Sequence, residues 1–386
     1  MHPFPARMAP EIALKAIPSR ELGVLTILDP MCGSGTVLGV AVSEGHHAVG
    51  VDIDPLAVMM SRLTVTEIKH DVLEEAIDPI VAAARKTEGF SPWGEDQETA
   101  TFVDYWFGST QQSQLRRLTT AIDGVEDSDI QLALRLAISR IIVTKSPQAS
   151  LAADTAHSRP HRVQTESDYD VIAGFEKSAR QLARMLAARK FLGTGTVDLG
   201  DARLLATVDP ETVDLAVTSP PYLNALDYLR GHKLALVWFG HKISDLRVRR
   251  SASIGAERSP DTPASETVGA IVDLIESEAV DVTTLKRPML ERFAEDCMGF
   301  ASQLRRTLKR NGKAVLVVGN SSLRGNYIRN DVIAQLAMER AGFSLSDRYE
   351  RDIPPTSRYM AMSSAGSDLR ITKRMRSEVV LTMSLP

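Results

Sequence analysis

Short, nearly continuous apolar segments recur along the chain and predict buried β-strands separated by helices. Strands covered on both faces have this composition, because helices on each side remove both sets of side chains from water. We therefore expect an α/β protein built on a mostly parallel sheet, with a closing antiparallel pair near the C-terminal end. The strands are expected at residues 24–29, 47–52, 195–201, 213–219 and 313–320, and the antiparallel pair at 343–353 and 377–385.

One long stretch interrupts this alternation. Between Asp52 and Asp201 the chain runs far beyond the roughly 30 residues of a strand–helix–strand unit. Apolar residues at helical spacing fill much of the excess. We expect a helical insertion at 66–190, a candidate substrate-recognition region, within a catalytic domain formed by 1–65 and 191–386.

Basic residues form local clusters, although the chain as a whole is slightly acidic. It has 45 Lys and Arg against 49 Asp and Glu, a formal net charge of -4. Contact with a polyanion must therefore come from local clusters, each of which could equally be a solvated surface. One cluster lies in 245–285, a segment rich in Ser, Pro, Ala and charge that we expect to be mobile. The clusters are Arg247, Arg249 and Arg250; His157, Arg159, His161 and Arg162; and Arg370, Lys373, Arg374 and Arg376.

A glycine-rich turn, DPMCGSGT, follows the first expected strand. Gly33 and Gly35 let the backbone turn sharply and approach a ligand at the carboxyl end of that strand. A phosphate loop would need a Gly-Lys-Ser/Thr sequence, and a dinucleotide fingerprint would need a glycine where Leu38 stands. The remaining interpretations are a loop for S-adenosylmethionine, beginning at Asp29, and a tight turn that only packs a helix on the sheet.

Further acids stand at expected strand ends. Asp52 in GVDIDP ends the second strand, where a carboxylate can accept hydrogen bonds from both hydroxyls of a ribose. Asp54, which precedes Pro55, is typical of a helix cap, so the two acids can have different roles. Asp201 in LGDARLL could accept a hydrogen bond from an adenine amino group, or it could be an exposed turn residue.

The sequence TSPPY at 218–222 follows another buried strand. Pro220 and Pro221 fix the backbone and remove two N–H donors, so carbonyl groups there can point at a ligand. Tyr222 supplies a flat face for stacking. A nucleic-acid base flipped out of its stack needs acceptors for its amino hydrogens and an aromatic platform. A strand that merely ended in prolines would not call for a tyrosine beside them.

The chain resembles the S-adenosylmethionine-dependent DNA amino-methyltransferases of restriction–modification systems in five segments and in their order. These segments are FPARMAPEI, DPMCGSGT, GVDIDP, GDARLL and TSPPY. The resemblance covers most of 1–65 and 195–386. It implies a Rossmann-like seven-stranded methyltransferase sheet, mostly parallel, and methyl transfer from S-adenosylmethionine to an exocyclic base amine. It also implies double-stranded DNA with a flipped base as substrate, and a restriction or defence-system partner.

The resemblance assigns roles to the residues that match each motif. The aromatic and small residues of the first motif would line the methionine end of the cofactor. The implied cofactor-binding residues are Phe4, Ala6, Asp29, Gly33, Gly35, Asp52 (ribose) and Asp201 (adenine). The implied catalytic residues are Ser219, Pro220, Pro221 and Tyr222.

Serine at the first position of the catalytic tetrapeptide is associated in that family with N4 of cytosine, and Asp or Asn with N6 of adenine. Cytosine N4 is therefore favoured. Many Ser-Pro-Pro-Tyr enzymes have the motifs in a permuted order, whereas the order found here also occurs in enzymes that methylate guanosine in transfer RNA. N6-adenine methylation of DNA and base methylation of RNA stay open as alternatives.

Metal and thiol chemistry have little support in the sequence. The two cysteines, Cys32 and Cys297, exclude a disulfide framework and a cysteine-rich zinc site. No third ligand accompanies His157 and His161, so we expect no metal. Methylation of an amine needs no covalent adduct and hence no catalytic cysteine. No apolar run approaches the ~20 residues of a membrane span, and we expect a cytoplasmic enzyme with no membrane partner.

Overall fold

The computed structural model describes residues 8–145, 147–155, 160–223, 227–256, 263–279, 281–323, 326–353 and 377–386. They form two compact units, each with its own hydrophobic core. We call the first the sheet unit; it comprises the described residues of 6–53, 192–225 and 251–386. We call the second the helical unit; it comprises those of 54–191 and 226–250.

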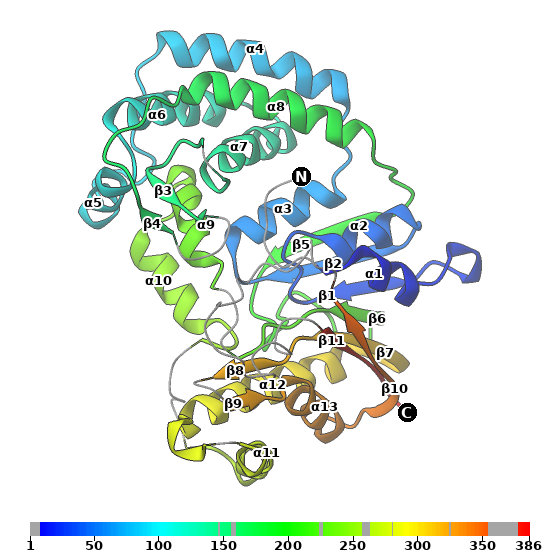
Figure 1. The fold of residues 1–386 in the computed structure, drawn as a ribbon. Helices are drawn as coiled ribbons and strands as arrows, with labels where there is room; N and C mark the ends of the chain where they lie inside the picture. Colours follow the sequence, from blue (N-terminus) through cyan, green and yellow to red (C-terminus); the bar gives the residue numbers. More distant parts are fainter. Residues whose placement is uncertain are drawn as a thin grey trace. The chain divides into compact units, whose positions relative to one another are not determined.

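The sheet unit is built on seven strands in the order β10-β11-β7-β6-β1-β2-β5 (Figure 1). Neighbouring strands from β7 to β5 are parallel, whereas β11 runs antiparallel to both β7 and β10. The expected mostly parallel sheet and its closing antiparallel pair are therefore confirmed. The strands are β1 (Thr26–Asp29), β2 (His47–Asp52), β5 (Thr194–Leu199), β6 (Val213–Thr218), β7 (Leu308–Val318), β10 (Ser344–Asp352) and β11 (Ser377–Ser384).

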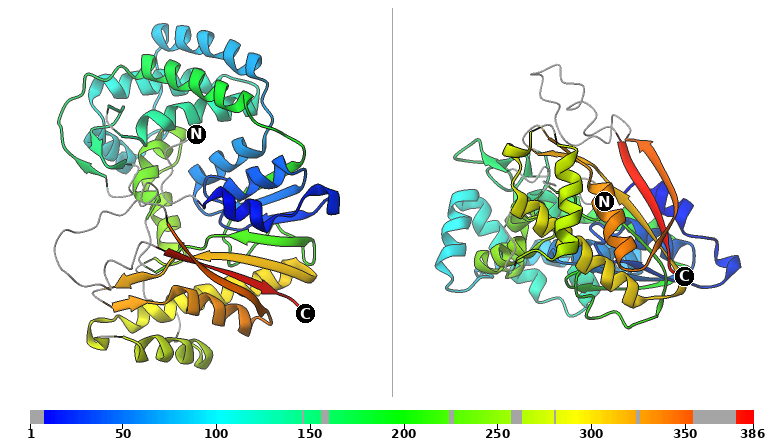
Figure 2. Two further views of the ribbon diagram at one scale, coloured as in Figure 1. Left: turned by 45° about the vertical axis from the view of Figure 1, so that its right-hand side comes forward. Right: turned by 90° about the horizontal axis from the view of Figure 1, so that it is seen from below.

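Helices cover both faces of this sheet, which explains why the central strands are nearly continuously apolar. Helices α1 (Pro10–Ala16) and α2 (Thr36–Ser43) lie on one face, and α12 (Arg287–Thr307) and α13 (Asn330–Arg340) on the other (Figure 2). Apolar residues at helical spacing on α12 face the sheet unit's core. The remaining elements of this unit are η1 (Arg20–Leu22), α11 (Glu266–Ser277), η4 (Val282–Thr284), β8 (Ser321–Leu323) and β9 (Asn326–Ile328).

The helical unit is a layered helix bundle in which α4 and α8 lie side by side and pack on α6 and α7 (Figure 1). Its core includes Trp238, whose ring meets Phe107 and Trp93 edge to face at centroid distances of 5.2 and 5.3 Å. Its elements are α3 (Pro55–Val65), α4 (His70–Lys86), α5 (Gln97–Trp106), α6 (Ser109–Asp123), α7 (Ser128–Ile142), β3 (Ala152–Ala153), β4 (His161–Arg162), α8 (Val171–Ala187), α9 (Leu229–Leu236), η3 (Val237–Phe239) and α10 (Ile243–Ala252).

Aspartates define where three of these helices begin. Asp96, Asp127 and Asp170 cap α5, α7 and α8 by accepting hydrogen bonds from first-turn N–H groups. Each such cap stabilises its helix by about 1 kcal/mol, because it satisfies donors that have no partner within the helix. Asp54 caps α3 in the same way, through the N–H of Leu56 at 2.9 Å, as its position before a proline predicts.

The units do not coincide with the boundaries expected from the sequence. The helical unit begins at Asp54 and includes 226–250, which we had expected in the catalytic domain. The segment 245–285, which we expected to be mobile, contains most of α10 and all of α11. Buried apolar residues at helical spacing hold α11 on α12, a signal that the high Ser, Pro and charge content obscured. No helix of the described residues is long and apolar enough to cross a bilayer.

Candidate active site

The described residues that the sequence motifs assign to the cofactor and the catalytic segment lie at or just after the ends of four adjacent strands, β6, β1, β2 and β5. In register, Asp29 of β1 pairs with Gly50 of β2, and Asp52 of β2 pairs with Leu199 of β5. Because these strands are parallel, their carboxyl ends meet at one edge, where open α/β sheets bind ligands. The structure thus brings the candidate residues together in the sheet unit. Phe4 and Ala6 lie outside the described residues.

The turn between β1 and α2 depends on glycine. The backbone φ angle is +50° at Gly33 and +80° at Gly35, in the left-handed region that favours glycine. Gly33 donates its N–H to the Asp52 carboxylate at 2.8 Å, so the turn is held to the end of β2. A Cβ added at Gly50 would lie 2.5 Å from Cδ1 of Leu38 in α2. Glycine at three positions therefore lets the turn, α2 and β2 approach closely.

Asp29 connects the glycine turn to the TSPPY segment. Its carboxylate accepts a hydrogen bond from Oγ1 of Thr218 at 2.8 Å, and the side chain is buried. A second hydrogen bond comes from the N–H of Met31 at 3.3 Å. Burial raises the pKa of Asp29 to about 7; the hydrogen bonds oppose this shift, and the charge of Asp52 adds to it. The carboxyl group is thus poised to change charge near neutral pH.

We expect Asp29→Asn to remove a pH dependence of stability. In the unfolded chain Asp29 titrates near its ordinary pKa of 3.8 and in the folded chain near 7. Its stabilising contribution is therefore complete below pH ~4 and is lost as the pH rises through ~7. The unfolding free energy of the wild type, relative to Asp29→Asn, should fall between pH 5 and 7 with a slope approaching about 1.4 kcal/mol per pH unit. Urea unfolding followed by circular dichroism at several pH values measures this slope. If the unfolding free energies of the wild type and Asp29→Asn changed with pH in parallel, the raised pKa of Asp29 would be contradicted.

Ser219 stands exposed at the end of β6. Its hydroxyl donates its hydrogen to the carbonyl oxygen of Val317, in the neighbouring strand β7, at 2.9 Å. A hydroxyl group has one hydrogen and two acceptor lone pairs. While Ser219 donates its hydrogen to Val317, its lone pairs remain to accept a hydrogen bond from a ligand, which suits an amino group.

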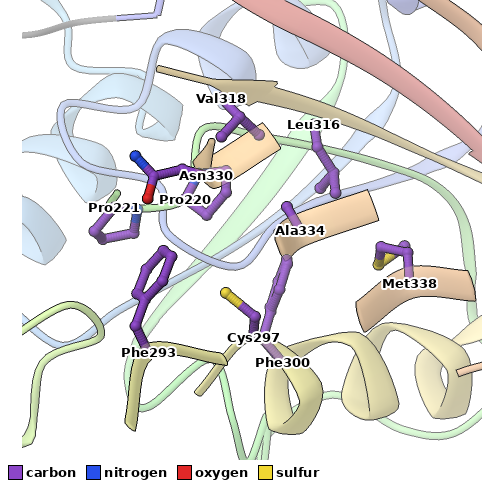
Figure 3. Close-up of a pocket in the computed structure, with 10 residues that line it drawn as sticks. All are labelled: Pro220, Pro221, Phe293, Cys297, Phe300, Leu316, Val318, Asn330, Ala334 and Met338. Atoms are coloured by element: carbon purple, nitrogen blue, oxygen red, sulfur yellow. The ribbon is translucent and has the colours of Figure 1, made fainter. Parts of the chain in front are cut away.

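The two prolines anchor the segment to the sheet unit's core. Figure 3 shows Pro220 and Pro221 above Phe293, with Phe300 of the same helix α12 deeper in the core. These side chains line a cavity of about 10 Å³. A space of that size holds roughly one water molecule at most. It is a packing gap behind the prolines, too small for a substrate or cofactor, and the segment is exposed instead at Ser219.

Tyr222 lies against the backbone that follows β7. A Cβ added at Gly319 would lie only 3.1 Å from Cε1 and 3.3 Å from Cδ1 of the Tyr222 ring. The ring is half-buried, so part of it remains accessible. Glycine at 319 therefore supports one side of the aromatic platform, a role that no sequence motif had indicated.

Asn330 joins the two loops that carry this platform. The side chain is fully buried at the start of α13. Its amide nitrogen donates to the carbonyl of Gly319 and to Oγ of Ser321, both at 3.0 Å. Its amide oxygen accepts from the N–H of Leu223 at 3.4 Å. The sequence alone did not indicate Asn330, because an asparagine at the start of a helix is an ordinary feature and its partner Leu223 lies far away in the chain.

Asn330→Ala should lower both stability and the methyl-transfer activity that the sequence motifs lead us to expect. Removing the amide leaves buried partners of Asn330 without hydrogen bonds, which costs about 1–3 kcal/mol of unfolding free energy. The control is Asn326→Ala, since Asn326 is also buried and hydrogen-bonds Asp281 and Thr284 away from the TSPPY segment. Denaturant unfolding should show similar losses for both variants, and single-turnover methyl transfer should fall further for Asn330→Ala. Equal activities would refute a positioning role.

Asp201 is held by an arginine that the sequence analysis did not include. Arg203 Nη2 lies 2.5 Å from one carboxylate oxygen of Asp201, and its Nε lies 3.0 Å from the other. Arg203 also contacts Asp296 at 2.5 Å. Burial would raise the pKa of Asp201, but the hydrogen bonds and charge of Arg203 outweigh it and hold the pKa below its ordinary value. Contact of Asp201 with an adenine stays a prediction. The sequence could have indicated its partner, because Arg203 stands only two residues after Asp201.

Comparison with known proteins gives one similar protein of curated function. No protein-family model matches the chain. Over 263 residues the chain is 24% identical to Type II methyltransferase M.MvaI from Kocuria varians, a match that covers 63% of this chain and 58% of that protein. The chain thus spans less than two thirds of that relative's length. The match bears out the resemblance of the sequence motifs to methyltransferases.

Solved structures that resemble the chain are also methyltransferases, at low similarity. One, described as a DNA modification methylase from Thermus thermophilus complexed with S-adenosyl-L-methionine, is 18% identical over 48% of this chain and 51% of that one, with a TM-score of 0.26. A SAM-dependent methyltransferase from Methanosarcina mazei is 9% identical over 98% of this chain and 99% of that one, with a TM-score of 0.34. The fold assignment, a Rossmann-like seven-stranded sheet of the methyltransferase type, rests on the order and directions of the strands.

Proposed function

We propose that this chain is an S-adenosylmethionine-dependent DNA methyltransferase that methylates an exocyclic base amine, with N4 of cytosine as the favoured target. The observation that carries the proposal is the hydrogen bond from Thr218 to Asp29. It ties the segment suited to a flipped base to the glycine turn suited to the cofactor, although 189 positions separate the two residues. Methyl transfer requires the reacting atoms to approach within about 3–3.5 Å, which adjacent strand ends allow.

The residues around the glycine turn fit S-adenosylmethionine. Gly33 and Gly35 adopt left-handed backbones, so the chain can pass close to a bound molecule. The Asp52 carboxylate, positioned by the N–H of Gly33, ends β2 where a ribose can be bound through its hydroxyls. When bound, S-adenosylmethionine supplies a methyl group that its sulfonium already activates.

The TSPPY segment would then act by hydrogen bonding and positioning. An exocyclic amine is a weak nucleophile because its lone pair is delocalised into the ring. Ser219 Oγ and the Pro220 carbonyl would accept its hydrogens, which favours the tetrahedral nitrogen needed for attack, while Tyr222 stacks on the base. A thiol adduct has no role in this scheme. Burial, with the nearby charge of Asp296, raises the pKa of the Cys297 thiol far above its ordinary value.

DNA is proposed as the substrate because the similar protein from Kocuria varians is named a type II methyltransferase. Cytosine is favoured because the tetrapeptide begins with Ser219, the residue associated with cytosine N4 in the family that the motifs resemble. N6-adenine methylation of DNA and base methylation of RNA are the alternatives. The proposed substrate form is a duplex with its target base flipped out, and a restriction or defence-system partner is proposed from the resemblance alone.

Mapping the modified base tests this function directly. The protein would be expressed together with a plasmid in cells that lack other DNA methyltransferases, and plasmid and total RNA would be digested to nucleosides for mass spectrometry. We expect N4-methylcytosine in the plasmid and none in cells with an empty vector. N6-methyladenine would overturn the choice of cytosine, and a new methylated nucleoside in RNA with unmodified plasmid would overturn the choice of DNA.

A further inference from the structure

The helical unit contains a basic pocket that none of the sequence motifs includes. It has a volume of about 270 Å³ and is lined by Trp106 of α5, Pro160 before β4, and Arg230 and Lys233 of α9. All four of these described residues belong to the helical unit.

Lys233 is the unusual group of this pocket. It is half-buried, and its ammonium nitrogen lies 5.1 Å from the centroid of the Phe102 ring. Burial lowers the pKa of Lys233, and the cations Arg250, Arg230 and Arg247 lower it further, against the opposing charge of Asp227. No carboxylate among the described residues forms an ion pair with Lys233. A partly desolvated cation without such a partner gains most from binding an external anion.

The arginines around Lys233 leave an excess of positive charge. Asp227 pairs with Arg230 at 2.9 Å and also with Arg250. Glu98 pairs with Arg247. Four cations, counting Lys233, thus stand against two carboxylates. These charges sum to +2, although the chain as a whole is slightly acidic.

One aromatic side chain, Trp106, lines the same pocket, and a second, Tyr105, lies against it. Trp106 packs edge to face with Tyr105 at a centroid distance of 5.0 Å, and Tyr105 is 51% exposed. The guanidinium of Arg162 lies 5.0 Å from the centroid of the Tyr105 ring. Cations beside accessible rings are the combination that binds nucleic-acid strands, in which charge follows the phosphates and aromatic rings stack on bases. A free inorganic anion would make no use of the rings.

We propose that this pocket binds a backbone phosphodiester of the DNA substrate through Lys233 and Arg230, with an adjacent nucleotide against Tyr105 and Trp106. The proposal rests on the proposed function, because it takes DNA as the substrate. Residues of two basic clusters seen in the sequence lie around this site: Arg247 and Arg250 add positive charge near Lys233, and Arg162 lies over the Tyr105 ring.

The salt dependence of DNA binding tests the proposal. Each phosphate neutralised by a protein cation contributes about 0.9 to the slope of log affinity against log salt concentration. Lys233→Gln and Arg230→Gln should each reduce this slope by up to about 0.9, so that the loss of affinity between 50 and 200 mM NaCl shrinks by roughly 3- to 4-fold. Fluorescence anisotropy with a labelled duplex measures it. Lys233→Arg should restore the slope, and Lys177→Gln, which removes an exposed charge from α8, should leave it unchanged.

Further arms separate the possible failures. Tyr105→Ala should weaken DNA binding without changing the slope, as expected for lost stacking. If the wild type neither binds nor methylates DNA, the proposed function fails, and this proposal with it. If the wild type methylates DNA and both glutamine variants keep the wild-type slope, only the pocket assignment is overturned. Calorimetry with inorganic phosphate alone covers the remaining case. Suppose that phosphate binds tightly, that Lys233→Gln abolishes this binding, and that the salt dependence of DNA binding does not change in that variant. The pocket would then be a site for small anions, and the proposal would be overturned. Circular dichroism melting checks that each variant is folded. If Lys233→Gln does not fold, the variant Arg230→Gln, at a more exposed residue, still tests the proposal.

Discussion

Tyr222→Ala is expected to lower the rate of methyl transfer by roughly ten- to a hundredfold, because stacking a base on an aromatic side chain is worth about 1–3 kcal/mol. The structure places the Tyr222 ring against Gly319 at the end of β7, with the Asn330 amide joining the loops on either side. The ring is therefore held in place, and the proposed scheme uses its face. Tyr222→Phe keeps that face and should retain substantial activity.

Single-turnover kinetics with a defined duplex and labelled cofactor would measure both variants. Tyr349→Ala is the matched control, since this tyrosine lies on the edge strand β10 of the same unit and should transfer methyl at the wild-type rate. Cofactor affinity should not change in any of the three proteins. If Tyr222→Phe were as inactive as Tyr222→Ala, the hydroxyl would be the working part of the residue and the stacking role would be wrong.

Asp52→Ala is expected to weaken the binding of S-adenosylmethionine by about 1–3 kcal/mol, roughly 5- to 150-fold, the range for a lost hydrogen-bonding partner that is charged. Two effects contribute. The proposed ribose hydroxyls lose their acceptor, and the N–H of Gly33 loses the carboxylate that holds the glycine turn to β2. Asp52→Asn keeps an acceptor oxygen in nearly the same place, so it should bind more tightly than Asp52→Ala and less tightly than the wild type.

Isothermal titration calorimetry with S-adenosylmethionine gives these affinities directly. Asp209→Ala serves as the control, because Asp209 is an exposed residue of the same unit and lies before β6, away from the carboxyl edge of the sheet. Wild-type affinity in Asp52→Ala would eliminate the ribose assignment. If Asp52→Ala lost both cofactor binding and melting temperature while Asp52→Asn lost neither, the main role of Asp52 would be to hold the glycine turn rather than to bind the ribose.

The sequence by itself determined the parts of this protein that depend on local pattern. Apolar segments predicted the five parallel strands and the closing pair, because a strand buried on both faces needs no polar alternation. The motifs also placed Asp29, Asp52, Asp201 and Ser219 at the ends of expected strands, from which their position at one edge of a parallel sheet follows. That inference needed only the topology, since parallel strands present their carboxyl ends on the same side. Composition misled in 245–285, where the Ser-, Pro- and charge-rich stretch before α11 obscured the apolar stripe of that helix.

Contacts between distant positions were decided only by the tertiary structure. The hydrogen bonds of Thr218 with Asp29, of Asn330 with Gly319 and of Arg203 with Asp296 have no local signature. The pocket at Lys233 likewise needs α5, α9 and the segment before β4, which lie far apart in the chain. Periodicity and capping act within a few residues, so they specify elements and the ends of elements. Which side chains then meet depends on how the elements pack, and packing is a property of the folded chain as a whole.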